Sequence, residues 1–330
     1  MTKLIPLAPL LGSSPARVET AHSLLTAFRI SGFLYLNDYS SLIPSELIRR
    51  VFDSSAHFFA RSQSEKDDLA WTTPRSNRGY VCMGREKVSS GATKEEVAKD
   101  RESGGQDLKE SFEIGREGEV DFPNQWPHSD EESMKFRKTM QDFFLRCRQL
   151  HAVLMRGIAI DMGLEETFFD HFTQRGDNTL RLLHYPAVPA GGFEGGKRVR
   201  AGAHSDFGSL TLLFQDKRGG LQVERPERDG VWLDVEPKED TIVINAGDLL
   251  ARWSNDMIRS TKHRVVEPPR RGTEKDGGHP PRYSVAYFCN PDFNEWIEVL
   301  PGTWEGERGG KKYGGINSGE YLVQRLTATY

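Results

Sequence analysis

The chain has 330 residues, of which 37% are hydrophobic and 28% charged, the composition of an ordinary globular protein with a large core. Its formal net charge of −4 and the lack of long runs of like charge argue against nucleic acid or an anionic membrane as a partner. The three cysteines are too few and too widely spaced for a disulfide framework, and no stretch has the hydropathy of a membrane span or a signal peptide. We therefore expect a cytoplasmic protein, while the sequence leaves its oligomeric state open.

The N-terminal part of the chain predicts helices, two short strands and one long irregular region. In three segments, apolar residues recur at three- and four-residue steps, which is the pattern of helices with one buried face. The predicted helices cover about residues 15–31, 44–59 and 131–162, and the predicted strands cover 4–7 and 33–36. Residues 62–128 are polar and rich in glycine, so we expect long loops with short elements there. We divide the chain into an N-terminal region, 1–130, and a region with the long helix and most strands, 131–330, packed as one compact unit.

Beyond residue 178 the pattern changes to short apolar runs separated by glycine pairs and charged turns, which predict strands. These runs cover residues 180–186, 209–214, 220–224, 231–235, 241–246, 262–267 and 282–289. So many short strands indicate an all-β sandwich or barrel, and the helices that precede them indicate a mainly β core with flanking helices. Residues 268–281 are rich in proline, glycine and charge and predict a surface loop, and 318–328 predict a short helix.

Two histidines and one aspartate have the spacing of a metal site. His204 and Asp206 are two residues apart, so on a strand both side chains would project from the same face. A later strand-like run contains His263. Two imidazoles and one carboxylate can bind iron(II) and leave positions open for further ligands. Zinc hydrolases use the same kinds of ligand, so these three residues alone do not identify the chemistry.

A second pair of polar residues favours iron over zinc. Arg282 and Ser284 again share one face of a predicted strand. An arginine binds a carboxylate through two hydrogen bonds, and a serine hydroxyl can donate one more. A dicarboxylate cosubstrate that chelates iron through one end needs such a group for its other end. The order of these residues after the predicted metal ligands therefore indicates 2-oxoglutarate as cosubstrate.

These motifs resemble the isopenicillin N synthase-like family of 2-oxoglutarate/iron dioxygenases, and the resemblance covers nearly the whole chain. It rests on Ile5–Leu7, Ser31–Tyr35, Leu182–Pro186, His204–Asp206, Asn245–Asp248, Lys262–Val265 and Arg282–Ser284. The family implies a double-stranded β-helix (jelly-roll) core, with iron(II), 2-oxoglutarate and O2 as cofactor and cosubstrates, and ascorbate as a helpful addition in vitro. It also implies that Tyr185 helps Arg282 and Ser284 to hold the distal carboxylate of 2-oxoglutarate. The chain departs from the family at Leu183, where asparagine is common, and in the length of the 268–281 loop.

Within this family the chain resembles the fungal thymine dioxygenases in several long stretches. They are Trp71–Pro74, Asn77–Tyr80, Gly84–Val88, Leu180–Val188, Ala246–Asp256, His279–Pro291 and Gly315–Tyr330. This resemblance implies a flat ring stacked between Phe207 and Phe288, with Arg181 on a ring carbonyl. Phe207 stands where those enzymes carry a tyrosine. Asn290 shares the face of Phe288, and Asn77 lies in the long N-terminal loop region, so both are further candidates for substrate contacts.

Other interpretations of these residues remain open at this stage. Phe288 is equally suited to core packing, and Arg181 to a structural salt bridge, since a buried arginine needs a partner. The predicted reaction is hydroxylation of a small planar molecule, with the 5-methyl group of thymine as the first choice. The alternatives are a hydroxylase or desaturase of a fungal secondary metabolite, a metal-binding relative without turnover, and an oxidase that needs no cosubstrate. The Arg282 and Ser284 pair argues against the oxidase, because that chemistry has no dicarboxylate to bind.

Overall fold

Two β-sheets packed face to face form the centre of the molecule. The computed structural model describes residues 2–86, 107–128, 130–189, 192–193, 199–225, 227–268, 278–305 and 309–329. The main sheet has the strand order β1-β2-β10-β7-β12-β5-β4-β3, and the second sheet has the order β6-β11-β8-β9. The strands of the main sheet are β1 (Lys3–Pro6), β2 (Phe33–Asn37), β3 (Gly79–Val81), β4 (Glu110–Gly115), β5 (Thr179–Tyr185), β7 (Leu210–Gln215), β10 (Ile242–Ala246) and β12 (Arg282–Phe288). Those of the second sheet are β6 (Ala201–His204), β8 (Leu221–Glu224), β9 (Trp232–Asp234) and β11 (His263–Val265), and a separate pair is β13 (Trp296–Ile297) with β14 (Ile316–Asn317).

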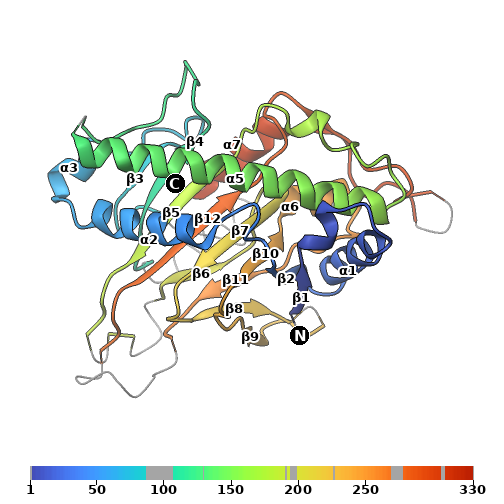
Figure 1. The fold of residues 1–330 in the computed structure, drawn as a ribbon, viewed down its shortest axis with the longest axis horizontal. Coiled ribbons are helices and arrows are strands. Elements are labelled where there is room, and N and C mark those ends of the chain that lie inside the picture. The colour runs from blue at the N-terminus through green and yellow to red at the C-terminus, as the bar shows by residue number, and fades with distance from the viewer. Residues whose placement is uncertain are drawn as a thin grey trace.

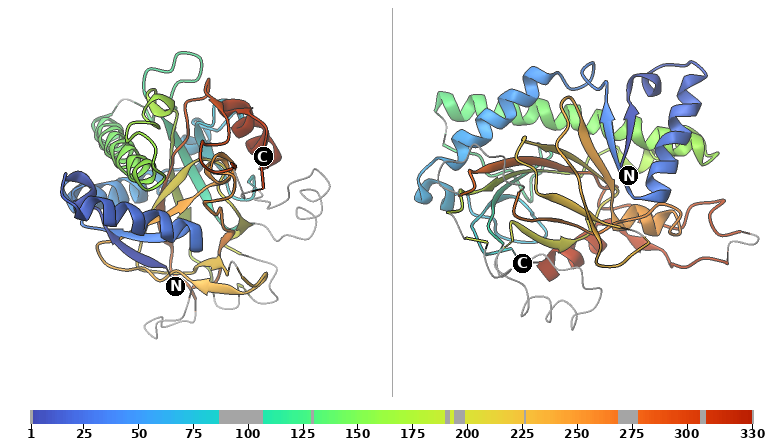
Figure 2. Two further views of the ribbon diagram at one scale, coloured as in Figure 1. Left: turned by 90° about the vertical axis from the view of Figure 1, so that its right-hand side faces the viewer. Right: turned by 90° about the horizontal axis from the view of Figure 1, so that it is seen from below.

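The longest helices cover the outer face of the main sheet. The helices of the structure are α1 (Ala16–Ile30), α2 (Ser45–Phe59), α3 (Gln63–Asp67), α5 (Glu131–Asp161), α6 (Asp248–Trp253) and α7 (Ser318–Thr329), with short 3-10 turns η1 (Ala8–Leu11) and η2 (His171–Thr173). The long helix α5 crosses the whole sheet beside α1 and α2, as Figure 1 shows. Figure 2 places α7 on the opposite side of the sheet. Among the described helices, none combines the length and the apolar character that crossing a membrane would require.

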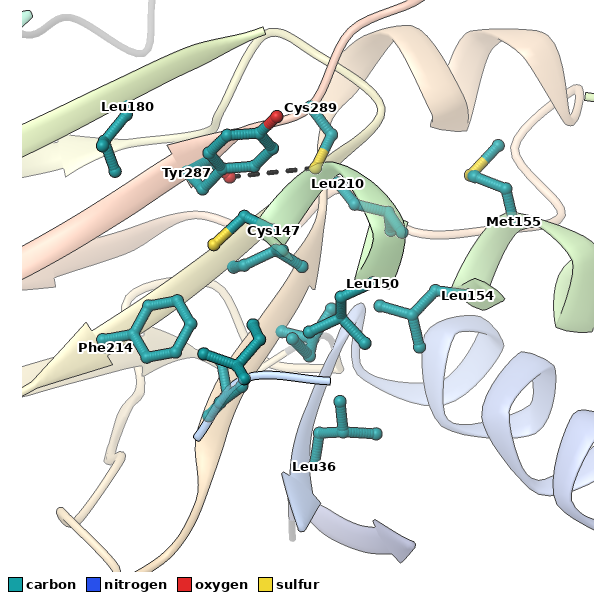
Figure 3. Close-up of a cluster of buried hydrophobic side chains, with 14 of the residues drawn as sticks. Leu36, Cys147, Leu150, Leu154, Met155, Leu180, Leu210, Phe214, Tyr287 and Cys289 are labelled. Atoms are coloured by element: carbon teal, nitrogen blue, oxygen red, sulfur yellow. Dashed lines mark hydrogen bonds between the residues drawn. The ribbon is translucent and has the colours of Figure 1, made fainter. Parts of the chain in front are cut away.

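Alternating residues of the central strands divide the interior into two cores. On one face, Leu180 and Tyr287 pack beneath α5 against its apolar side chains, among them Cys147 and Leu150 (Figure 3). This larger core continues to α1 and α2. Because neighbouring strand residues point to opposite faces, the alternate residues of the same strands form a second, smaller core. That core lies between the two sheets, since it joins residues of β2, β5, β10 and β12 to residues of β6, β8 and β11.

The structure confirms the predicted jelly-roll core and most predicted elements to within one or two residues at their ends. The elements that were not predicted include the strand β6, the helix α6, and the strand β4 inside the region assigned to loops. The strand β4 is an interior strand of the main sheet, because it pairs with β3 on one side and with β5 on the other, there over six residues from Glu110 to Gly115. Most of the predicted 268–281 loop lies outside the described residues, and the division of the chain at residue 130 stays a prediction.

Candidate active site

The register of two strand pairs brings the predicted site residues together. In the main sheet, Arg282 on β12 lies directly opposite Tyr185 on β5. The side chains that face the smaller core therefore come from Arg282 and Ser284 on one strand and from Arg181 and Tyr185 on the other. In the second sheet, β6 and β11 run antiparallel, and His263 lies opposite His204. The site thus forms between the two sheets, where the inward-facing residues of both meet.

His204, Asp206 and His263 form a compact group of three potential ligands. Their ligand atoms all lie within 4.8 Å of one another, and the Asp206 Oδ1 atom is 4.0 Å from His204 Nε2 and 3.7 Å from His263 Nε2. The two residues His204 and Asp206 do not share a strand, because β6 ends at His204 and Asp206 lies in the turn that follows. The turn nevertheless directs both side chains toward one point.

Neighbouring groups fix the orientation of His204 and Asp206. His204 Nδ1 donates to the Gly202 carbonyl at 2.7 Å, which leaves the lone pair of Nε2 directed at the group. The Asp206 Oδ2 atom accepts hydrogen bonds from Thr211 at 2.6 Å and from Asn245 at 2.7 Å, so Oδ1 is the oxygen turned to the histidines. Such fixed outer contacts are typical of metal ligands.

The electrostatics of this group favour the protonation states that bind a cation. Burial, together with the nearby His263, lowers the pKa of His204 to about 3, so its imidazole is neutral at physiological pH. Burial opposes ionisation of Asp206, but the two imidazoles and its two hydrogen bonds outweigh that effect and lower its pKa. Two imidazole nitrogens and one carboxylate oxygen are the donor set of a facial iron(II) site with open positions, and they fit the predicted metal.

Next to this group the smaller core contains two buried arginines. Arg282 and Arg200 have exposed fractions of 1% and 0%, and their guanidinium carbons lie 4.8 Å and 5.9 Å from the centre of the Tyr185 ring. Arg282 donates to Ser284 Oγ at 3.1 Å and to Gln215 at 3.3 Å, and Arg200 donates to the Pro280 carbonyl at 3.0 Å.

Neither arginine has a carboxylate partner among the described residues, and Arg282 Nε, Arg200 Nε and Arg200 Nη1 have no hydrogen-bond acceptor there. A buried cation without an anion is costly. These two arginines therefore fit a bound dicarboxylate such as 2-oxoglutarate.

A pocket lies beside the metal-ligand group, and His204 and Asp206 are part of its lining. All five residues predicted to touch substrate line it: Asn77, Arg181, Phe207, Phe288 and Asn290. The pocket also has contributors that the sequence did not indicate, namely Glu86, Thr179, Gly208, Leu322, Leu326 and Thr329. Leu322, Leu326 and Thr329 belong to α7, so the C-terminal helix closes the end of the pocket.

Three of the five predicted residues also have structural partners. The Asn290 amide donates to the Asp177 carbonyl at 3.0 Å, and Asn77 accepts from the Trp71 indole at 3.1 Å, so both amides support the pocket wall. Arg181 forms the salt bridges that were considered as its alternative role, with Glu86 at 3.0 Å and with Glu113 at 2.7 Å. These ion pairs do not remove Arg181 from the pocket, whose wall it lines together with Glu86.

Each aromatic ring of the pocket is packed against a guanidinium. The Arg181 guanidinium lies 5.2 Å from the centre of the Phe288 ring, and the Arg325 guanidinium lies 4.6 Å from that of Phe207. Arg325 is held by Asp248 at 2.9 Å and comes from α7. The alternative that Phe288 serves only core packing does not account for its place in the pocket wall. The C-terminal helix thus supports Phe207 as well as closing the pocket.

The residues that the sequence did not indicate share one property: their partners are far away along the chain. Arg200 lies just before β6, and the pairing of β6 with β11 is irregular between His204 and Ala201, so alternation from His204 does not predict the direction of its side chain. Glu86 carries no signal either, since nothing in its neighbourhood predicts Arg181 as its partner.

Known proteins resemble the chain along its whole length. Residues 176–291 match the model of the 2OG-Fe(II) oxygenase superfamily, and residues 3–129 match that of the non-haem dioxygenase in morphine synthesis N-terminal region. The structure of the thymine 7-hydroxylase of Neurospora crassa with alpha-KG and thymine is 50% identical, with a TM-score of 0.87 over 100% of this chain and 97% of that one. Two curated fungal relatives are each 35% identical: proline hydroxylase buaE of Petromyces alliaceus, over 97% of both chains, and 2-oxoglutarate-dependent dioxygenase gloF of Glarea lozoyensis, over 94% of this chain and 93% of its own.

Proposed function

This chain belongs to the 2OG-Fe(II) oxygenase superfamily, and we propose that it hydroxylates the 5-methyl group of thymine to give 5-hydroxymethyluracil. It is a 2-oxoglutarate-dependent dioxygenase that uses iron(II), 2-oxoglutarate and O2. The observation that carries the choice of thymine is the pocket, which joins two aromatic rings to Arg181 beside the metal-ligand group. The 50% identity to a thymine hydroxylase over the whole chain supports it.

In this proposal the metal-ligand group and the buried arginines have separate tasks. His204, Asp206 and His263 hold iron(II), which, with 2-oxoglutarate and O2, supplies the oxidation of a C–H bond while 2-oxoglutarate is converted to succinate and carbon dioxide. Arg282 and Ser284 bind the distal carboxylate of 2-oxoglutarate, and the buried Arg200 adds a second cation there.

Tyr185 lies against both of these cations and limits the space between them. The residues around it exclude water from the carboxylate, which strengthens each charged hydrogen bond.

The substrate residues act by position. Phe207 and Phe288 offer flat faces for a pyrimidine ring, and Arg181 donates to a ring carbonyl, which fixes the rotation of the ring in its plane. A ring held in this way keeps one methyl group at the side of the metal, and positioning of this kind supplies much of the selectivity of an enzyme. The leucines of α7 complete the apolar enclosure. We also place the enzyme in the cytoplasm, where its three free cysteines would stay reduced.

Mass spectrometry of a single reaction tests the proposal. The purified protein, iron(II), 2-oxoglutarate and thymine should give 5-hydroxymethyluracil together with an equal amount of succinate. The control omits thymine and measures the succinate that forms without coupling. Succinate that rises with another compound, and no oxidised thymine, would leave the dioxygenase activity in place and refute thymine as the substrate.

A second candidate function is oxidation of a fungal secondary metabolite on the same framework. Two related proteins, from Petromyces alliaceus and Glarea lozoyensis, favour it. Each is 35% identical to this chain over nearly its whole length, and they are a proline hydroxylase and a 2-oxoglutarate-dependent dioxygenase. Phe207, which lacks the hydroxyl of a tyrosine, favours it as well. The same mass-spectrometric experiment with free proline and with cyclic amides in place of thymine distinguishes the two.

A further inference from the structure

One wall of the substrate pocket is a network of buried charged side chains that begins on strand β4 of the main sheet. Glu113 on β4 lies directly opposite Arg181 on β5, and Glu113 Oε1 is 2.7 Å from Arg181 Nε. Glu86 accepts a hydrogen bond from Arg181 Nη1 at 3.0 Å, and its second oxygen lies 3.2 Å from Lys109 Nζ. Lys109 also contacts Asp107 at 3.3 Å. All five side chains have exposed fractions of 10% or less, so each is held in place by its neighbours.

The surroundings of Arg181 disfavour an anionic ligand. Two carboxylates, Glu86 and Glu113, are paired with this one guanidinium. The charge of Arg181 is thus offset on two sides before any ligand arrives. A carboxylate ligand would therefore gain little from Arg181 and would be repelled by Glu86.

Of the three carboxylates, only Glu86 lines the pocket. Glu113 has an exposed fraction of 0% and lies behind Arg181. A ligand in the pocket therefore meets a guanidinium and a carboxylate side by side. A guanidinium only donates hydrogen bonds and an ionised carboxylate only accepts them, and each carboxylate oxygen can accept more than one. Glu86 can keep its bond from Arg181 and still accept another from a ligand.

We propose that Glu86 is a specificity residue that accepts an N–H of the substrate, so that Glu86 and Arg181 together select a neutral ring with an N–H next to a C=O. This inference rests on the proposed function for the place of the substrate in the pocket, and it deepens it by naming the substrate class as cyclic amides and imides. A ring without that N–H gives the buried Glu86 carboxylate no hydrogen-bond donor, and this weakens the binding of such a ring. Because buried neighbours fix Glu86 beforehand, binding does not have to order it.

Binding measurements with methylated rings test this role. Dissociation constants for thymine, 1-methylthymine and 3-methylthymine are measured by calorimetry without O2, in the presence of manganese(II) and 2-oxoglutarate. For the wild-type protein, at least one methylated ring should bind about 10- to 100-fold more weakly than thymine, the loss expected for one hydrogen bond to a charged group. In Glu86→Met, thymine and that same methylated ring should bind within about threefold of each other, because no acceptor remains to distinguish them.

Glu113→Met is the matched control, since it removes a carboxylate from the same arginine outside the pocket. It should weaken thymine and the methylated rings by the same factor and so preserve the wild-type ratio. If Glu86→Met fails to fold, Glu86→Gln takes its place, and the ratio should fall below that of the wild type because a neutral amide oxygen is a weaker acceptor than a carboxylate. Equal binding of all three rings by the wild-type protein would overturn the inference, and so would a ratio that persists in Glu86→Met.

The outcomes also separate this inference from the proposed reaction. If the wild-type protein distinguishes N–H from N-methyl rings but forms no 5-hydroxymethyluracil, then thymine hydroxylation is wrong and the role of Glu86 stands. If 5-hydroxymethyluracil forms while both methylated rings bind as tightly as thymine, the reaction stands and the role of Glu86 is wrong. Preferred binding of the carboxylated ring orotate over thymine and uracil would also overturn the inference.

Discussion

Replacing Arg200 by methionine should change stability and cosubstrate affinity in opposite directions. The Arg200 side chain is fully buried, and two of its three nitrogens have no acceptor among the described residues. Burial and the like charge of Arg282 lower the pKa of Arg200 to about 10, so the fold itself disfavours this cation. A bound dicarboxylate would reverse that balance, because it supplies the missing anion.

The magnitudes follow from the groups involved. Each buried donor without a partner costs about 1–3 kcal/mol, while the bond to the Pro280 carbonyl returns about 1 kcal/mol. For the two unpartnered nitrogens of Arg200, Arg200→Met should therefore raise the free energy of unfolding by about 1–5 kcal/mol when 2-oxoglutarate is absent. The same change removes charged hydrogen bonds to the cosubstrate, so its dissociation constant should rise about 10- to 100-fold.

Two assays check these values. Urea unfolding without cosubstrate gives the change in stability, and calorimetry with manganese(II) in the absence of O2 gives the affinity for 2-oxoglutarate. Arg282→Met should show the same loss of affinity, and Arg228→Met, at an exposed position, should change stability by less than about 0.5 kcal/mol. If Arg200→Met binds 2-oxoglutarate as the wild type does, or unfolds more easily without it, then Arg200 serves the fold and not the cosubstrate.

Three further changes test other parts of the site. His263→Ala should abolish the rise in melting temperature that iron(II) gives the wild-type protein, and chelation with EDTA should lower the wild type to the level of the variant. Arg181→Ala should reduce thymine hydroxylation at least about tenfold more than it reduces uncoupled succinate formation, as measured by mass spectrometry of both products, since only the former needs the ring oriented. Glu110→Gln should lower the free energy of unfolding in urea by about 3–5 kcal/mol, because it leaves the buried Lys66 without its anion at 2.8 Å. Although burial raises the pKa of Glu110, hydrogen bonds from His184, Lys66 and Tyr80 lower it below 4.5. The wild-type protein should therefore lose this stability as the pH falls below about 4.5, and the variant should not, because it has no carboxyl group to protonate.

The grouping of the candidate metal ligands, and that of Arg282 with Ser284, could be predicted because each pattern is local. Two residues at even spacing on one strand project together whatever the rest of the fold does, and this placed Arg282 with Ser284 correctly. His204 and Asp206 come together for a different reason, since Asp206 lies beyond the end of β6. The strand ends between them, and it is Thr211 and Asn245 that turn the carboxylate inward.

The charged wall of the pocket could not be predicted because its strand does not have the composition of one. Glu110, Ser111 and Glu113 give β4 a polar sequence, and such a segment is typical of a loop. All three residues are nevertheless buried, because Lys66 and Arg181 neutralise the two carboxylates from other elements. Burial of a charge depends on a partner that only the folded chain supplies, and hydropathy along the sequence contains no information about it.

The two ends of the site use buried arginines in opposite ways. Arg181 lies between two carboxylates, so it keeps its hydrogen-bond donors while its charge is offset, and it is suited to a neutral ligand. Arg282 and Arg200 have no carboxylate partner among the described residues, so their charge is available and suited to an anion. If the two ends were alike, a dicarboxylate could bind at either of them and block the substrate. In the proposed function, the distribution of carboxylates, more than that of arginines, thus determines which arginines bind 2-oxoglutarate and which bind the molecule to be oxidised.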